Sequence, residues 1–248
     1  MEWFERWFGE EYLTVYEHRN TEEAEREIQA ITKLLDIQGN ELILNLCCGA
    51  GRHDFHLVNS GCRVIGLDYS IHMLKLAIEK RHFNCDYPDY VRADARKIPF
   101  RDGSFDIILN LFTSFGYFED SENRELIHSI SRLLKPCGKF LIDYINPSKT
   151  IANLVEESTK EKEGLLIIEK RDYNQTARRV EKTITLQRDK HSQVFHESVQ
   201  LYESNEMIKM LSDAGLKTKN ILGSVEGEPY SESSERMIIY GSKEKYDI

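Results

Sequence analysis

The chain has 248 residues, of which 40% are hydrophobic and 30% are charged, and its formal net charge is −9. This length suits one large α/β domain with an insertion, and the composition excludes a disordered or fibrous protein. The negative charge argues against nucleic acid as a partner, because binding to a phosphate backbone needs clustered Lys and Arg. The one locally basic segment, 169–182, is interpreted as a solvated strand face.

Segments that would direct the chain to a membrane are not expected. No apolar run is long enough to span a bilayer, and residues 1–12 lack the basic start and apolar middle of a signal peptide. The five cysteines are odd in number and contain no CxxC pair. This usage fits a reducing compartment without a metal site. We therefore expect a cytoplasmic protein, a monomer or a homodimer, whose partner is a small molecule.

The predicted elements begin with an N-terminal helical cap over residues 1–38, and short apolar strands then alternate with helices. The predicted strands are 41–47, 62–68, 89–94, 104–112 and 138–145. The predicted helices are 52–60, 70–82 and 121–136, the last of them stopped by Pro136. Such alternation predicts a parallel sheet that is covered by helices on both faces.

The pattern changes after Asn146. Segments 164–173, 179–188 and 193–202 are rich in β-branched and aromatic residues and are separated by polar turns, which predicts an inserted antiparallel meander. A helix at 203–215 and strands at 216–223 and 236–243 then resume the α/β pattern. We expect a doubly wound, seven-stranded, mostly parallel sheet. Its core spans 39–146 and 201–248, and the inserted subdomain at 147–200 lies over the active site.

A glycine turn follows the first predicted strand. Gly49 and Gly51 keep side chains away from the crevice where doubly wound sheets bind ligands. Asp68 ends the second strand, 19 residues after Gly49. This is the sequence spacing at which a carboxylate reaches a ribose. The third glycine of a dinucleotide loop is replaced by Asp54, and no Gly-Lys-Ser/Thr follows. The pattern predicts a nucleoside-bearing cofactor without phosphates.

Several motifs in this order resemble the class I S-adenosylmethionine-dependent methyltransferases, of the ubiquinone-biosynthesis and glycine/sarcosine-like type. "LNLCCGAGRH" is similar to the first motif of that family, and "VIGLDYSIHML" to the second. "VRADARKIPFRDGSFDIILNLFTSFGYF" is similar to the third and fourth motifs, and "LLKPCGKFLID" to the approach to strand five. The resemblance covers roughly residues 40–146, and it implies the Rossmann-like fold of the family.

The resemblance also implies S-adenosylmethionine as cofactor and a small-molecule methyl acceptor. It assigns Asp68 to the ribose and Asp94 to the adenine. The cofactor-binding residues that it implies are Tyr16, Arg19, Asn45, Cys47, Gly49, Gly51, Asp68, Tyr69, Met73, Asp94, Ala95 and Leu111. The chain departs from the family in three places: Asn45 stands in place of an acid, and Cys47 and Cys137 stand in place of glycines.

The reaction implied is direct attack by the acceptor on the sulfonium methyl, in which the protein aligns the reactants. If the acceptor must lose a proton, Tyr117 and Tyr144 are the candidate bases. Substituting Asn45→Asp is expected to tighten cofactor binding or leave it unaltered, if the acid of the family acts through its charge. Two alternatives stay open: a catalytically silent adenosylmethionine-binding module, and a nicotinamide-dependent oxidoreductase.

Overall fold

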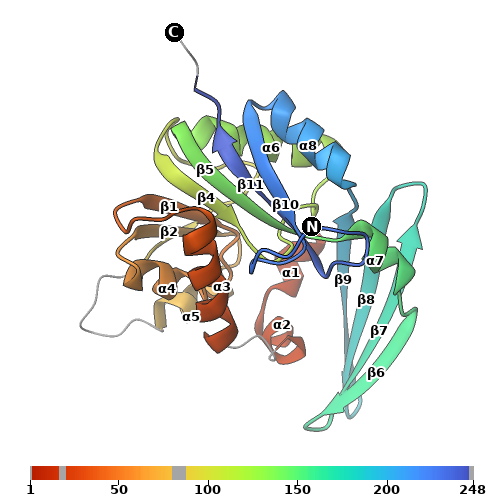
Figure 1. Cartoon of the computed structure of the whole chain (residues 1–248). Coiled ribbons are helices and arrows are strands. Elements are labelled where there is room, and N and C mark those ends of the chain that lie inside the picture. The colour runs from red at the N-terminus through yellow and green to blue at the C-terminus, as the bar shows by residue number, and fades with distance from the viewer. Residues whose placement is uncertain (1, 17–20, 80–87, 246–248) are drawn as a thin grey trace.

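The computed structural model describes residues 2–16, 21–79 and 88–245 (Figure 1). Within these residues the larger of two sheets has seven strands, in the order β10-β11-β5-β4-β1-β2-β3. Strand β11 is antiparallel to both of its neighbours, and the other strands are parallel to one another. The bounds are β1 Leu42–Leu46, β2 Arg63–Asp68, β3 Asp89–Arg92, β4 Phe105–Asn110, β5 Leu134–Ile145, β10 Leu216–Leu222 and β11 Arg236–Lys243. The predicted seven-stranded, mostly parallel sheet is confirmed.

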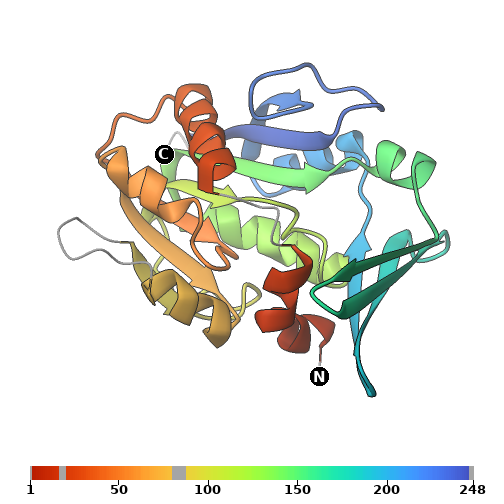
Figure 2. The same cartoon turned by 90° about the horizontal axis from the view of Figure 1, so that it is seen from below.

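Helices cover both faces of this sheet (Figure 2). Their bounds are α3 Thr21–Leu34, α4 Asp54–Asn59, α5 Ile71–Glu79, α6 Asp120–Leu133 and α8 Ser204–Asp213. Successive residues of β1 face opposite sides, because side chains alternate along a strand. Ile43 packs with Ile31 of α3, whereas Leu44 packs in the other core with Ile130 of α6. Both residues are 0% exposed, as expected for a central parallel strand.

The order of the strands fixes where a ligand can bind. From β1 the chain continues toward β2 and β3 on one side, and β4 and β5 lie on the other side. The carboxyl ends of β1 and β4 therefore flank the point at which the strand order reverses. Open α/β sheets bind their ligands in the crevice at such a point.

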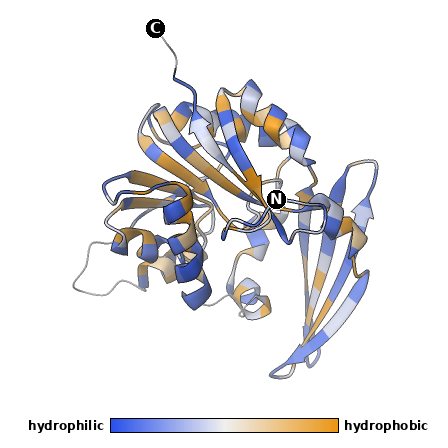
Figure 3. Cartoon of the chain, in the orientation of Figure 1, coloured by the Kyte–Doolittle hydropathy of each residue, from blue (hydrophilic) through white to orange (hydrophobic). Residues whose placement is uncertain are grey.

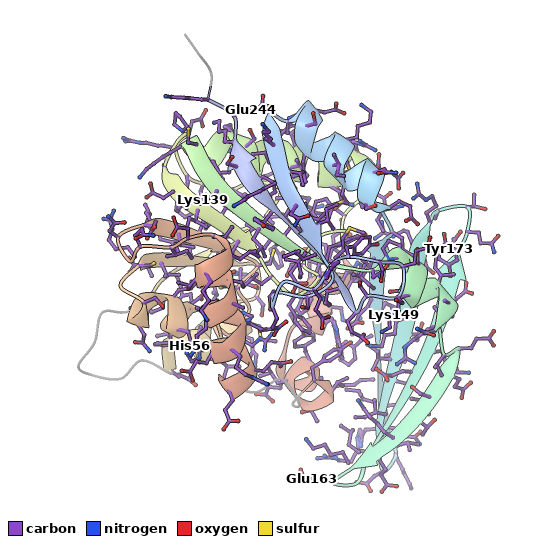
Figure 4. The ribbon with its side chains drawn as sticks, viewed as in Figure 1. His56, Lys139, Lys149, Glu163, Tyr173 and Glu244 are labelled. Carbon is purple, nitrogen blue, oxygen red and sulfur yellow. The ribbon has the colours of Figure 1, made fainter. Side chains whose placement is uncertain are left out.

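The smaller sheet is antiparallel, in the order β6-β7-β8-β9. Its bounds are β6 Glu157–Lys162, β7 Leu165–Asn174, β8 Arg179–Arg188 and β9 His191–Gln200. Glu163 marks the turn at its far tip, and Tyr173 lies toward the opposite end (Figure 4). Hydrophobic residues gather in the strands of the larger sheet, whereas the outer strand β6 is hydrophilic (Figure 3).

Two short N-terminal helices, α1 Trp3–Trp7 and α2 Glu10–Val15, lie between the two sheets in both views (Figures 1 and 2). Trp7 is 0% exposed and packs with Ile184 of β8 and Phe195 of β9. Helix α3 instead packs on the larger sheet. The predicted cap over 1–38 thus has two parts. Helices α1 and α2 bridge the sheets, since Trp7 and Val15 pack on the smaller sheet and Phe4 packs in a core of the larger one, whereas α3 packs on the larger sheet.

Three elements differ from their prediction. Strand β6 was missed because its sequence, ESTKEK, is that of a charged edge strand without an apolar face. The short helix α7 Pro147–Ala152 was also missed. The helix expected to run to Pro136 ends at Leu133, and Pro136 lies inside β5. The residue before a proline disfavours helical backbone, which explains the early end.

The division into a cap, a core and an inserted subdomain with the boundaries predicted above remains a proposal. Strands β6–β9 all fall within residues 157–200, which is compatible with it. Among the residues that the structure describes, no helix combines the length and the hydrophobicity needed to cross a membrane.

Candidate active site

A cavity of about 360 Å³ lies at the carboxyl ends of β1, β2 and β4. Its size is within the range of small-molecule sites. One part of its wall comes from the glycine turn and the ends of these strands, and the other part comes from α1, α2 and the loop after β4. The lining residues are Phe4, Phe8, Tyr12, Leu13, Tyr16, Asn45, Cys47, Cys48, Gly49, Ala50, Arg52, His53, Asp68, Tyr69, Met73, Ala93, Asp94, Ala95, Leu111, Phe112, Ser114, Tyr117 and Phe118.

The glycine turn is held by Asp68 at the end of β2. The amide of Gly49 donates to Oδ2 of Asp68 and the amide of Ser70 donates to Oδ1, each at 2.8 Å. Burial raises the pKa of the Asp68 carboxyl, and these amides act in the opposite direction. Gly49 has a φ of +56°, and a Cβ built on it would meet nothing within 4 Å. The turn therefore presents open backbone to the cavity beside a carboxylate.

Gly51 has a different role from the one predicted. It does not line the cavity. A Cβ at this position would collide with the hydroxyl of Tyr90 and would lie 3.1 Å from the Cβ of Ala77. Its φ of +67° is also the left-handed region that favours glycine. Close packing beneath the turn, rather than contact with a ligand, requires glycine here.

Asn45 is the last residue but one of β1 and lines the cavity, with an exposure of 1%. Its Nδ2 donates to Oδ1 of Asp54, the first residue of α4, at 2.6 Å. Its Oδ1 is buried and has no hydrogen-bond partner among the described residues. A buried acceptor without a donor is costly, so this oxygen points to a ligand that donates a hydrogen bond.

Asp94 lines the cavity and is already engaged by an arginine. Nε of Arg96 lies 3.1 Å from both carboxylate oxygens, and Nη2 lies 2.8 Å from Oδ2. Burial acts to raise the pKa of Asp94, but its hydrogen bonds with Arg96 outweigh burial and hold the pKa below its usual value. A ligand amine at Asp94 would therefore share this carboxylate with Arg96.

Comparisons of the sequence and of the structure with known proteins show what this chain is similar to. Residues 43–138 match the family model described as a methyltransferase domain. The cypemycin N-terminal methyltransferase of a Streptomyces species is 29% identical over 206 residues, which cover 79% of this chain and 81% of that protein. The chain is therefore similar to the class I S-adenosylmethionine-dependent methyltransferases, and the match to a methyltransferase domain covers residues 43–138.

Two other similarities complete the comparison. An uncharacterized methyltransferase of Synechocystis is 34% identical over 117 residues, covering 46% of this chain but only 52% of the length of that relative. The structure of the CcbJ methyltransferase from Streptomyces caelestis superposes with a TM-score of 0.81 at 18% identity, over 97% of this chain and 99% of that one. At that identity the likeness shows the fold alone.

The structure brings most of the predicted site residues together. Those that line the cavity are Tyr16, Asn45, Cys47, Gly49, Asp68, Tyr69, Met73, Asp94, Ala95, Leu111 and Tyr117. Arg19 lies outside the described residues. Tyr144 is 0% exposed and does not line the cavity. Its hydroxyl donates to the backbone oxygen of Gln200 and accepts from the amide of Tyr202. Burial also raises its pKa, so Tyr144 joins the two sheets and is no longer a candidate base.

The aromatic wall of the cavity is attached to the smaller sheet through Glu197 of β9. Nε1 of Trp7 donates to Oε1 of Glu197 at 2.6 Å, and the hydroxyl of Tyr16 donates to the same oxygen at 2.8 Å. Nζ of Lys182 lies 3.2 Å from Oε2 of Glu197. These contacts hold α1 and α2 in place against β8 and β9.

Arg179 is a functional residue that the sequence did not reveal. It lies in the basic segment that we interpreted as a solvated strand face, yet it is only 8% exposed, so that interpretation is wrong for this residue. Its guanidinium donates to the backbone oxygens of Phe118 at 2.9 Å and Tyr117 at 3.0 Å. It also donates to Oγ of Ser198 at 2.8 Å. Arg179 thereby joins the smaller sheet to the loop after β4, at the cavity residues Tyr117 and Phe118.

The loop after β4 has a strained start. Phe112 and Thr113 have φ values of +62° and +56°, which are costly for residues with a Cβ. The amide of Phe112 donates to Oδ2 of Asp143, and the amide of Thr113 donates to the backbone oxygen of Asp143, each at 2.9 Å. Arg236 pairs with Oδ1 of the same carboxylate at 2.6 Å. Asp143 thus supports the backbone that places Phe112 in the cavity wall.

The two cysteines that replace family glycines have backbone conformations that favour glycine. The φ of Cys47 is +60° and that of Cys137 is +62°. Burial raises the pKa of the Cys47 thiol, and the carboxylates of Asp68 and Asp94 raise it further, which disfavours the reactive thiolate. Cys137 is exposed and lies away from the cavity, so it offers a clean test of the backbone cost.

Substituting Cys137→Gly should raise the free energy of unfolding by about 0.5–1 kcal/mol. The left-handed conformation costs a residue with a Cβ about 1–2 kcal/mol, and the greater freedom of glycine in the unfolded chain offsets about half of the gain. Chemical denaturation measures the difference. Cys137→Ala is the control, since it removes the thiol and keeps the Cβ. Equal stability of the Gly and Ala variants would contradict the explanation.

Proposed function

We propose that this chain transfers the methyl group of S-adenosylmethionine to a nitrogen, oxygen or carboxylate of a small molecule. The observation that carries the proposal is the arrangement of acceptors in one cavity. Oδ1 of Asn45, which is buried and has no partner among the described residues, lies near the end of β1, and the carboxylate of Asp68 ends the neighbouring strand β2. The open backbone of Gly49 lies beside them. The amide oxygen suits an ammonium group and the carboxylate suits a ribose, so the residues present fit this cofactor.

When bound, S-adenosylmethionine supplies a methyl group on a positively charged sulfur, which passes to a nucleophile in one displacement. The chain contributes binding and alignment. Asp68 would accept hydrogen bonds from ribose hydroxyls through lone pairs not used by Gly49 and Ser70. Tyr69, Met73 and Ala95 would pack against the adenine from the apolar part of the wall. The aromatic side chains of α1 and α2 would exclude water from the reacting atoms.

The acceptor would lie between α1, α2 and the loop after β4, where Tyr117 supplies the hydroxyl that remains a candidate base. Its ring packs against Trp3 at 4.9 Å and Phe8 at 6.0 Å between centroids. Tyr117→Phe keeps this packing and removes the hydroxyl.

The name of the cypemycin relative refers to methylation of an N-terminus. Amines are therefore the first acceptors to screen.

Calorimetric titration with S-adenosylmethionine, S-adenosylhomocysteine and NADH tests the proposal. Micromolar binding of both sulfur compounds without binding of NADH is expected. Binding of NADH alone would favour an oxidoreductase, although Asp54, which opens α4 as a buried carboxylate, would repel a pyrophosphate there. Tight cofactor binding without transfer to any acceptor would indicate a silent binding module. Binding of neither sulfur compound would refute the proposal.

A further inference from the structure

The pairing of Asn45 with Asp54 determines which atom of the Asn45 side chain faces the cavity. Asn45 is 1% exposed and Asp54 is 0% exposed, and the distance from Nδ2 of Asn45 to Oδ1 of Asp54 is 2.6 Å. In this contact Nδ2 of Asn45 donates and Oδ1 of Asp54 accepts, so the amide nitrogen faces Asp54. The amide oxygen must then face away from Asp54, and it is the oxygen that has no partner in the described residues.

The same pairing places the carboxyl group of Asp54 beside this end of the cavity. Position 45 is where the first motif resembles a family that has an acid, and this chain has an uncharged amide there. Asp54 lies nine residues further along the chain but in hydrogen-bond contact with that amide. A hydrogen bond to a carboxylate polarises the amide, which makes its oxygen a stronger acceptor in a site of low dielectric.

We propose that Asp54 is a positioning residue for the amino-acid end of S-adenosylmethionine. It turns Oδ1 of Asn45 toward the cavity and supplies, through that amide, the charge that attracts an ammonium group. The role rests on the proposed function. It reverses the expectation for Asn45→Asp, because that substitution brings two buried carboxylates together. Like charges in contact disfavour each other, so the substitution weakens binding.

Two ligands separate this role from a purely structural one. S-adenosylhomocysteine carries the ammonium group, whereas 5′-methylthioadenosine keeps the adenosine and lacks the amino-acid end. Asp54→Asn should weaken binding of S-adenosylhomocysteine about tenfold or more, because the charge is lost and the orientation of the Asn45 amide is no longer imposed. Binding of 5′-methylthioadenosine should change by less than about threefold. Equal weakening of both ligands would mean that Asp54 only shapes the turn, and would overturn the proposal.

The reciprocal double variant Asn45→Asp with Asp54→Asn is the decisive protein. It keeps both side-chain shapes and their hydrogen bond with donor and acceptor exchanged, so it remains informative even if a single variant does not fold. We expect its affinity for S-adenosylhomocysteine to return to within about threefold of the wild-type value, because the pair again carries one charge. An affinity that stays tenfold weaker, or a double variant that does not fold, would overturn the proposal. Wild-type protein that binds neither ligand would instead refute the proposed function itself.

Discussion

Substituting Asp68→Ala is expected to weaken binding of S-adenosylmethionine by about 2–3 kcal/mol, or roughly 30- to 150-fold. The carboxylate is the strongest acceptor at the end of β2, and it also receives the amide of Gly49 at 2.8 Å. Its removal therefore takes away the acceptor for the ribose and one support of the glycine turn. Isothermal titration of the purified variant measures the loss.

The pattern across ligands makes this prediction specific. S-adenosylhomocysteine and 5′-methylthioadenosine both contain the ribose, so Asp68→Ala should weaken both, in contrast to Asp54→Asn. Asp102→Ala is a suitable control, because Asp102 is exposed and pairs with Arg132 away from the cavity. Unchanged affinity in the Asp68 variant would remove this residue from the cofactor site.

Substituting Arg179→Met is expected to lower the free energy of unfolding by about 3 kcal/mol. Methionine retains an unbranched apolar chain but removes every donor. The partly buried backbone oxygen of Tyr117 then loses its bond from Arg179, and the buried oxygen of Phe118 keeps only the bond from Nδ2 of Asn123. Each buried acceptor that loses its donor costs about 1–3 kcal/mol. Because Tyr117 and Phe118 line the cavity, methyl transfer should fall as well. Chemical denaturation and a transfer assay on the same preparation measure the two effects.

A matched control lies on the same strand. Arg188 is exposed at the other end of β8, so Arg188→Met should change stability by less than about 0.5 kcal/mol. Arg179→Lys keeps the charge but has fewer donors, and it should fall between the wild type and Arg179→Met. If Arg179→Met and Arg188→Met were equally stable, the hydrogen bonds that Arg179 makes to the loop after β4 would contribute nothing to the free energy of unfolding.

Much of the fold could be predicted because it depends on local patterns. The strands of the larger sheet are short apolar runs, and helices with apolar residues at helical spacing follow them, so their order gives the sheet. The glycine turn and Asp68 are likewise tied to the end of a strand. Strand β6 could not be predicted from local patterns, because its charged residues lack the alternation of polar and apolar residues that identifies a strand with one buried face.

The sequence by itself thus determined the doubly wound sheet, the glycine turn and the resemblance to a family, because periodicity and motif spacing are properties of neighbouring residues. Only the tertiary structure decided that Tyr144 is buried away from the cavity, and that Arg179 is buried and joins the smaller sheet to the loop after β4. It also decided that Asn45 faces Asp54. These assignments depend on contacts between segments that the chain brings together only on folding, and the energy of a polar group is set by the partners that it meets there.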